Sequence, residues 1–336
     1  MLPEFKDLDS FRSLLASAPA QDRAALSAAE DRNGQLTKPP GALGRLEDLA
    51  IWYGGWRGTD RPRIEAPQVI IFAGNHGVTK QGVSAFPAEV TEQMVLNFQY
   101  GGAAINQLAG VAGADLSVVA LDLDTPTGDF TTGPAMSEAE VLDAMNRGAA
   151  AVSADADLLL LGEMGIGNST VAAALAAASF GGEVEDWVGP GTGSDADGIA
   201  RKVDAIARGL TRHDKAEGMD ILRCLGGREQ AAICGAVLAA RAHRVPVMLD
   251  GFICTAAAAP LFATEPQLLA HTMVAHLSAE PGHVRLTEAL GKRPLLDLDM
   301  RLGEGTGAAL AAMLLKGAVA CQNGMATFGE AGVSDA

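Results

Sequence analysis

Residues 158–170 read LLLLGEMGIGNST. Four leucines in succession predict a short strand that is buried on both faces, as in a parallel sheet. The three glycines after the leucines allow a tight turn, and the alanine-rich segment beyond Thr170 predicts a helix that begins beside it. This stretch predicts a βα unit with a ligand-binding loop at the carboxyl end of its strand.

The same pattern recurs from residue 67 onward, where short apolar runs alternate with helix-like segments. The other runs are residues 69–72, 116–121, 220–225, 245–249 and 273–277. Pro246 indicates that the strand in the fourth of these begins there or lies near an edge. Glycines and polar residues follow each run, and the carboxyl ends of parallel strands meet at one edge of a sheet. We therefore expect a composite site at that edge.

Both ends of the chain are predicted to be helical. Leu8, Phe11 and Leu14 recur at helical spacing, which predicts a helix over residues 1–30. Further helices are expected over residues 45–56 and in the alanine-rich segment 308–315.

The composition argues against nucleic acids and membranes as binding partners of this protein. With 25 basic and 41 acidic residues the formal net charge is −16, and no basic stripe indicates nucleic-acid binding. Apolar runs of about eight residues are too short to span a membrane, and the first residues lack the apolar core of a signal peptide. The four cysteines form no CxxC pair, so we expect reduced thiols that pack in the core of a cytoplasmic protein.

The loop at residues 162–169 is the best candidate for an anion site. Its spacing is that of a P-loop, but Asn168 stands where the phosphate-binding lysine belongs. Backbone N–H groups at the helix start would still hold a single phosphate. The alternative is a tight turn in which Asn168 or Ser169 is only the N-cap.

A second glycine loop, GPGTGSD at residues 189–195, precedes Lys202. On the helix expected from Gly198 onward, Lys202 would supply the cation that the first loop lacks. The alternative is a solvated surface lysine. Asp195 and Asp197 are candidates for capping that helix.

Near the C-terminus, residues 301–307 read RLGEGTG. Glycines on both sides of Glu304 allow the backbone to turn sharply and approach a bound molecule. The alternative is an ordinary connection in which Glu304 interacts with the dipole of the next helix.

Other candidate residues carry weaker signals. His76 follows a predicted buried strand, where a site role and a structural role are equally expected. The six histidines show no metal-ligand spacing, and the chain has no GxSxG nucleophile elbow. Near a further helix start, Ser84, Phe86 and Gln93 are candidates for lining a flat apolar pocket, although most of that helix face is expected to be core.

Together these motifs resemble the nicotinate-nucleotide–dimethylbenzimidazole phosphoribosyltransferase family of the cobalamin lower-ligand pathway, over residues 38–333. The matching segments are KP at 38–39, HGV at 76–78, GVS at 82–84, EVT at 89–91, QMV at 93–95, GGAAIN at 101–106, GEMGIGN at 162–168, GTG at 191–193, DGFI at 250–253 and RLGEGTG at 301–307.

The resemblance implies transfer of phosphoribose from nicotinate mononucleotide to 5,6-dimethylbenzimidazole, giving α-ribazole 5′-phosphate and nicotinate. It implies a Rossmann-like parallel sheet flanked by helices and a homodimer. A small helical domain would comprise residues 1–60 with 303–336, and an α/β substrate-binding domain residues 61–302. Small molecules are the expected partners, and no metal or other cofactor is expected.

The resemblance also implies roles for particular residues. Glu304 would be the general base, and Glu163 would sit beside the nucleotide, where it could assist the reaction. The expected substrate-binding residues are Ser84, Phe86, Gln93, Gly165, Ile166, Gly167, Asn168, Gly191, Thr192, Lys202, Leu302 and Gly303. The sequence departs from the family pattern at Asn75, where Asp is expected, and at Pro190, where Arg is expected.

The expected chemistry requires one proton acceptor. When a benzimidazole nitrogen attacks the ribosyl C1′, the ring becomes cationic unless its other N–H loses a proton, which a carboxylate accepts. Direct displacement would invert the β-glycosidic bond to α. Two other hypotheses are a nucleotide-dependent oxidoreductase, although no GxGxxG run with a downstream acid is present, and a non-catalytic nucleotide-binding protein.

Overall fold

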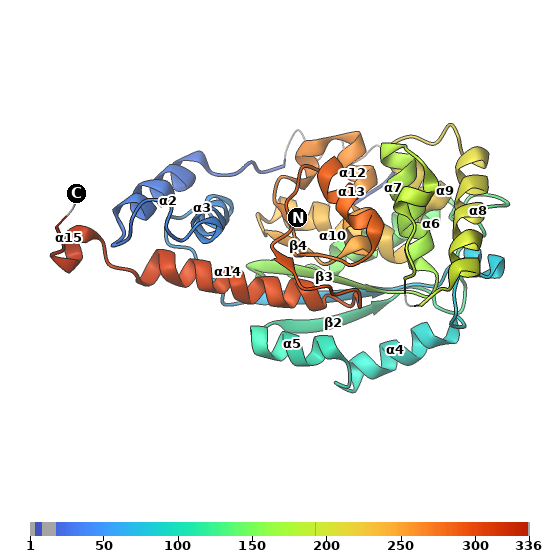
Figure 1. The fold of residues 1–336 in the computed structure, drawn as a ribbon, viewed down its shortest axis with the longest axis horizontal. Coiled ribbons are helices and arrows are strands. Elements are labelled where there is room, and N and C mark those ends of the chain that lie inside the picture. The colour runs from blue at the N-terminus through green and yellow to red at the C-terminus, as the bar shows by residue number, and fades with distance from the viewer. Residues whose placement is uncertain (1–3, 9–17, 192, 335–336) are drawn as a thin grey trace.

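A five-stranded parallel sheet forms the centre of the computed structural model, which describes residues 4–8, 18–191 and 193–334 (Figure 1). Its strand order is β2-β1-β3-β4-β5. The strands are β1 (Pro67–Ala73), β2 (Asp115–Ala120), β3 (Leu158–Met164), β4 (Val247–Leu249) and β5 (Thr272–Val274). β2 and β3 flank β1 on opposite sides, so the chain reverses direction across the sheet there. Such a reversal opens a crevice at the carboxyl ends of the strands.

The sheet is buried on both faces because its central strands carry apolar side chains at nearly every position. In β1, Ile70 and Phe72 belong to one buried cluster, whereas Val69 and Ile71 belong to the other. This alternation follows from the two-residue period of a strand. It confirms the predicted α/β fold with a parallel sheet flanked by helices.

Helices cover both faces of the sheet (Figure 1). The first cluster includes residues of α6 (Glu138–Ala151), α7 (Asn168–Phe180), α8 (Ala196–Arg212), α9 (Met219–Leu225), α10 (Arg228–Ala242), α11 (Phe252–Ala257), α12 (Ala259–Thr264) and α13 (Pro281–Ala289). The second includes residues of α3 (Arg45–Arg57), α4 (Glu89–Gln99), α5 (Ala104–Ala112) and α14 (Thr306–Gly324).

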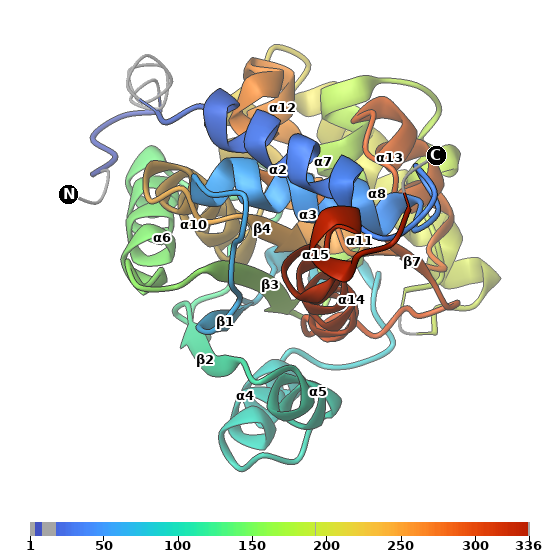
Figure 2. The same ribbon diagram turned by 90° about the vertical axis from the view of Figure 1, so that its left-hand side faces the viewer.

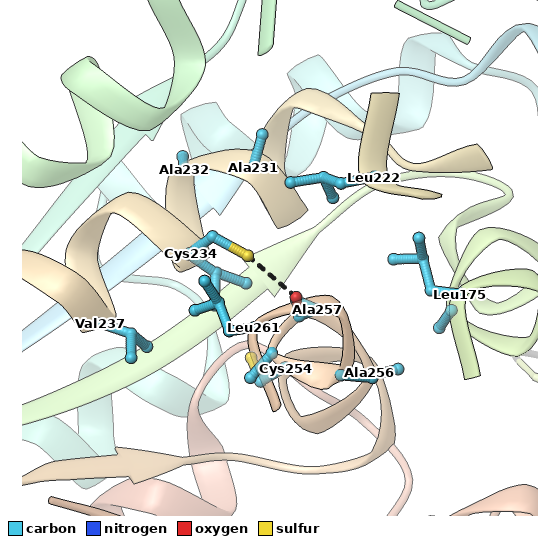
Figure 3. Packing of buried hydrophobic residues seen from close by; sticks show 14 of the residues in the cluster. Leu175, Leu222, Ala231, Ala232, Cys234, Val237, Cys254, Ala256, Ala257 and Leu261 are labelled. Atoms are coloured by element: carbon cyan, nitrogen blue, oxygen red, sulfur yellow. Dashed lines mark hydrogen bonds between the residues drawn. The ribbon is translucent and has the colours of Figure 1, made fainter. Parts of the chain in front are cut away.

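Small residues let these helices pack closely. A Cβ atom at Gly148 of α6 would lie 1.9 Å from the Ala232 carbonyl oxygen, and one at Gly235 of α10 would lie 1.9 Å from that of Met145. Figure 3 shows the adjoining part of the core, where the Cys234 thiol donates a hydrogen bond of 3.0 Å to the Ala257 carbonyl. Three of the four free cysteines are buried, as predicted, and Cys321 is half-buried.

Helices α2 (Arg23–Gln35) and α3, from the first part of the chain, pack near the end of α14 and α15 (Phe328–Ala331) (Figure 2). The Arg32 guanidinium donates hydrogen bonds to the carbonyl oxygens of Gln322 (2.9 Å) and Met325 (3.1 Å). The predicted division into two domains stays a prediction. The remaining elements are 3₁₀ helices η1 (Gly77–Gln81), η2 (Val184–Trp187) and η3 (Pro266–Leu269), and a two-stranded parallel sheet of β6 (His276–Leu277) and β7 (Leu296–Asp297).

One predicted strand is wrong, and another is divided into two. Residues 220–225 lie in helix α9, which buries Ile221, Leu222 and Leu225 and pairs Asp220 with Arg223 at i,i+3. Apolar positions spaced one and four residues apart fit a helix face as well as a short strand. Residues 273–277 do not form one strand either, because they divide between β5 and β6 in separate sheets.

The predicted N-terminal helix is confirmed only from residue 23 onward. Residues 4–8 and 18–22 are not helical, and residues 9–17, with Phe11 and Leu14, lie outside the described residues. Helix α2 begins only at Arg23, because the Asp22 side chain accepts hydrogen bonds from the backbone N–H groups of Ala24 and Ala25.

Candidate active site

A pocket opens at the carboxyl ends of β3 and β4, in the crevice that the strand order predicts. Most of the residues expected from the sequence meet there. Those that line it are Ser84, Glu163, Gly165, Ile166, Gly167, Asn168, Gly191, Lys202, Leu302 and Gly303. Thr192, also expected, lies outside the described residues.

One end of the pocket is the N-terminus of α7. Gly167, not Asn168 or Ser169, is the N-cap residue, with φ of 91° and no side chain that caps the helix. The interpretation of Asn168 as a cap is therefore wrong. The Asn168 amide instead donates a short hydrogen bond to the Glu163 carboxylate. An uncapped N-terminus attracts anions.

Lys202 supplies positive charge beside this helix. Its side chain is 2% exposed, so the surface-lysine alternative is wrong. The ammonium donates hydrogen bonds to the Ser169 hydroxyl (3.2 Å) and the Gly189 carbonyl (3.0 Å). Burial lowers the pKa of Lys202. Asp195 caps α8, the helix that carries Lys202, by accepting a hydrogen bond from the Gly198 N–H.

Arg301 and Glu280 complete this end of the pocket, and the sequence did not identify either as a site residue. The Arg301 guanidinium donates a hydrogen bond of 2.8 Å to the Gly191 carbonyl, so a cation lies beside the GTG loop although residue 190 is proline. The Glu280 carboxylate is 6% exposed, and burial raises its pKa. Their nearness to the loop depends on tertiary folding, not on any local motif.

At the other end of the pocket lies the turn that carries Glu304. Gly303, Glu304 and Gly305 all have left-handed backbones, with φ of 83°, 64° and 88°. Glu304 does not itself line the pocket but follows Gly303, which does. The Glu304 side chain is 5% exposed, and its Oε2 atom has no hydrogen-bond partner among the described residues. Burial, and then the charge of Asp250, raise the pKa of Glu304 to about 7.

Two more carboxylates are buried next to this turn. Burial, and then the charges of Asp250 and Glu229, raise the pKa of Glu163 well above its ordinary value. A Cβ atom at Gly303 would lie 2.4 Å from the Glu163 Oε1 atom, so the turn packs directly on this acid. Asp250 follows β4, and burial raises its pKa to about 7. Glu163 and Asp250 line the pocket that contains the cationic end, so opposite charges face one cavity.

His76 lies behind the pocket instead of lining it. Its Nε2 atom is 2.9 Å from the Glu229 carboxylate, and both side chains are fully buried. The ring packs against Gly165 and Gly227, where added Cβ atoms would lie 3.0 and 2.3 Å from it. His76 thus supports the glycine loop. The neighbouring Asn75 side chain donates a hydrogen bond to the Leu123 carbonyl at 3.0 Å.

Phe86 and Gln93 do not join the pocket. Both are exposed, and Phe86 is 48% exposed. Helix α4 begins at Glu89, so Phe86 lies in the segment before it. Among the residues that the structure describes, no group of three His, Cys, Asp or Glu side chains is arranged to hold a metal ion. Nor is any helix of that part of the chain long and apolar enough to cross a membrane.

Comparison with known proteins identifies close relatives. A phosphoribosyltransferase family profile matches residues 18–333. The nicotinate-nucleotide–dimethylbenzimidazole phosphoribosyltransferases of Ruegeria pomeroyi and Roseobacter denitrificans are 64% and 62% identical, with all of each chain covered. The crystal structure of the enzyme of that name from Thermus thermophilus is 42% identical, with a TM-score of 0.87, and the match covers 94% of this chain and all of that one.

Proposed function

The chain belongs to the nicotinate-nucleotide–dimethylbenzimidazole phosphoribosyltransferase family, and on that premise we propose that it transfers phosphoribose from nicotinate mononucleotide to 5,6-dimethylbenzimidazole. The products are α-ribazole 5′-phosphate and nicotinate. The proposal rests on one observation about the pocket. The uncapped N-terminus of α7 and the buried Lys202 line the same pocket as the turn that carries Glu304, whose buried Oε2 atom has no hydrogen-bond partner among the described residues.

The cationic end binds the 5′-phosphate of the nucleotide. The Gly167 backbone N–H at the uncapped start of α7 and the Lys202 ammonium provide hydrogen-bond donors and positive charge. A buried lysine binds a phosphate more strongly than an exposed one because less water competes for it. Gly165, Ile166 and Gly191 shape the loops that surround the phosphate.

Glu304 is the general base. Its unpartnered Oε2 accepts the N–H proton of the benzimidazole while the other ring nitrogen attacks C1′ of the ribose. A pKa of about 7 suits this role, because a general base works best when its pKa is close to the pH of the reaction. Glu163, whose pKa is raised by burial and then by the charge of Asp250, lines the same pocket beside the nucleotide and assists the reaction there. Nicotinate leaves as the C1′–N bond breaks, and attack from the opposite face gives the α-linkage.

Incubation of the purified protein with nicotinate mononucleotide and 5,6-dimethylbenzimidazole tests this function. We expect base-dependent release of nicotinate, quantified by chromatography, and an α-anomeric product, identified by NMR. Binding of the nucleotide without release of nicotinate would instead support the non-catalytic hypothesis. The relatives are transferases, which leaves the oxidoreductase hypothesis without support.

The predicted homodimer and cytoplasmic location remain part of the proposal. Large apolar side chains on α4 and α5 are exposed, with Tyr100 beside α4 at 84% and Val111 at 73%, which supports a subunit contact on this part of the surface. Sedimentation velocity, which reports the mass of the particle in solution, tests the dimer.

A further inference from the structure

Helix α14, which follows the Glu304 turn, is capped by a residue from another part of the fold. Its own N-cap residue is Gly305, which has no side chain to accept a hydrogen bond. Asp250, at the end of β4, takes this role. Its Oδ2 atom accepts a hydrogen bond from the Gly305 N–H (3.2 Å), and its Oδ1 atom accepts one from the Ala308 N–H (2.8 Å). A carboxylate at this position also interacts favourably with the helix dipole.

The turn needs such support because its backbone is strained. A left-handed conformation costs a residue with a side chain about 1–2 kcal/mol, and Glu304 adopts it between two left-handed glycines. Strain of this kind persists only where the surroundings hold it in place. The Thr306 hydroxyl donates a hydrogen bond to the Gly303 carbonyl (2.8 Å). Gly162 packs so closely that an added Cβ would lie 2.5 Å from the Glu304 carbonyl oxygen.

Asp250 differs from these other restraints because its side chain ionises, with a pKa that burial raises to about 7. The Asp250 side chain is buried. After burial, its charge is the main cause of the raised pKa of Glu304. Other titratable groups face this pair from neighbouring elements. Glu163 of β3 interacts with both carboxylates, His276 of β6 has its Nε2 atom 3.9 Å from Asp250 Oδ1, and Cys254 of α11 lies near Asp250. The charge of Glu229, on α10, contributes to the raised pKa of Glu163.

We propose that Asp250 is a positioning residue for the reaction: by capping α14 it holds the Glu304 turn in its left-handed conformation, and its negative charge favours proton uptake by Glu304. The inference rests on the proposed function, since it assigns Asp250 to the support of the proposed base. Asp250 touches no reacting atom in this scheme. Asp250 acts by accepting hydrogen bonds from the Gly305 and Ala308 N–H groups. It also acts by the electrostatic effect of its charge on Glu304.

Asp250→Asn changes both contributions, because the amide loses the charge and keeps only one of the two oxygens that accept the capping hydrogen bonds. We expect kcat to fall roughly tenfold or more, because a weaker base transfers the proton more slowly. The acid limb of the pH profile of kcat should move to lower pH, since removal of a nearby negative charge lowers the pKa of Glu304. KM for nicotinate mononucleotide should change by less than about twofold, because the phosphate end is untouched.

Thr306→Val is the matched control. It removes an uncharged restraint from the same turn, so it should lower kcat without moving the acid limb. An acid limb that stays at the wild-type pH in Asp250→Asn, or that moves equally in Thr306→Val, would overturn the electrostatic role of Asp250.

Two further measurements keep the inference testable if Asp250→Asn folds poorly. Asp250→Glu retains the charge but displaces it, so kcat should fall with the acid limb unchanged, whereas a wild-type kcat would overturn the positioning role. Amide hydrogen exchange at Gly305 and Ala308 should accelerate at least about tenfold in either variant relative to the wild type. This readout needs no activity, so it distinguishes failure of the capping role from failure of the proposed function.

Discussion

Helices α7 and α14 both begin next to the same pocket, and their N-termini are alike in their backbones. Each begins at a left-handed glycine, Gly167 with φ of 91° and Gly305 with φ of 88°, and neither N-cap residue has a side chain. They differ in what lies in front of them. The Asp250 carboxylate caps α14, whereas among the described residues no side chain caps α7, and the Lys202 ammonium lies beside it.

This difference shows how one backbone arrangement supports two kinds of chemistry. At α7 the uncapped helix start and the Lys202 ammonium form the proposed phosphate site. At α14 the Asp250 carboxylate already accepts hydrogen bonds from the helix N-terminus, and the turn before the helix carries Glu304, the proposed proton acceptor. Neighbouring side chains, and not the helix start itself, decide what each end of the pocket binds.

Loss of the carboxylate at the α14 end should have the largest effect. We expect Glu304→Gln to lower kcat by about 10²–10⁴-fold, the usual contribution of a general base. KM for nicotinate mononucleotide should change little, because the phosphate binds at the other end. Steady-state kinetics at saturating base measure both. If Glu304 interacted only with the helix dipole, the purified variant would turn over at nearly the wild-type rate.

Loss of the cation at the α7 end should act on binding instead. Lys202→Ala removes a charged hydrogen-bond donor, worth about 10- to 100-fold in affinity, so KM for nicotinate mononucleotide should rise by that factor. KM for the benzimidazole should stay close to its wild-type value. Lys215→Ala, at an exposed lysine outside the pocket, is the control. An unchanged KM for the nucleotide in Lys202→Ala would contradict the assignment of the phosphate to this end.

The two ends were not equally predictable from the sequence. The β3–α7 loop could be found because the strand, the glycines and the helix are contiguous in residues 158–170, and local patterns predict local structure. Glu304 stood out for the same reason, between glycines and before an alanine-rich helix. The burial of Lys202 could not be predicted, because it depends on α8 packing beside α7.

Residues that meet only through tertiary folding were missed. Asp250 is 55 residues from the N–H group that it caps, and Arg301 is 110 residues from the Gly191 carbonyl. The sequence shows Asp250 at the end of a predicted strand and Arg301 at the start of the RLGEGTG segment. No spacing rule indicates which distant backbone group each side chain reaches. The prediction of a strand at residues 220–225 failed because a short apolar run does not distinguish a strand from a helix.

A substitution at Gly303, in the turn before α14 that packs on Glu163, should have a smaller effect on kcat. Gly303→Ala places a Cβ at a left-handed position, 2.4 Å from the Glu163 Oε1 atom in the present backbone. Gly41→Ala is the matched control, because Gly41 is also left-handed, with φ of 74°, and has no atom within 4 Å of the added Cβ. Both variants should lose about 1 kcal/mol of stability from the backbone. Only Gly303→Ala should lower kcat, by roughly tenfold, because it displaces Glu163 and the turn.

The raised pKa of Glu304 predicts a pH-dependent gain in stability when this carboxylate is removed. Burial raises the pKa of Glu304 from 4.5 to about 7. Between these values the unfolded chain releases the proton while the folded protein keeps it. The contribution of Glu304 to stability is therefore present below about pH 4.5 and lost as the pH rises through about 7.

Glu304→Gln removes this penalty, so its Tm relative to the wild type should increase from pH 5 to pH 8, by on the order of a few °C. Thermal unfolding without substrates measures the difference, and Glu183→Gln, at an exposed position, reports the effect of removing a charge alone. A constant difference in Tm across this range would mean that Glu304 is not destabilised by burial. An increasing difference would mean that burial of the Glu304 carboxylate in the turn before α14 lowers the stability of the folded protein as the pH rises.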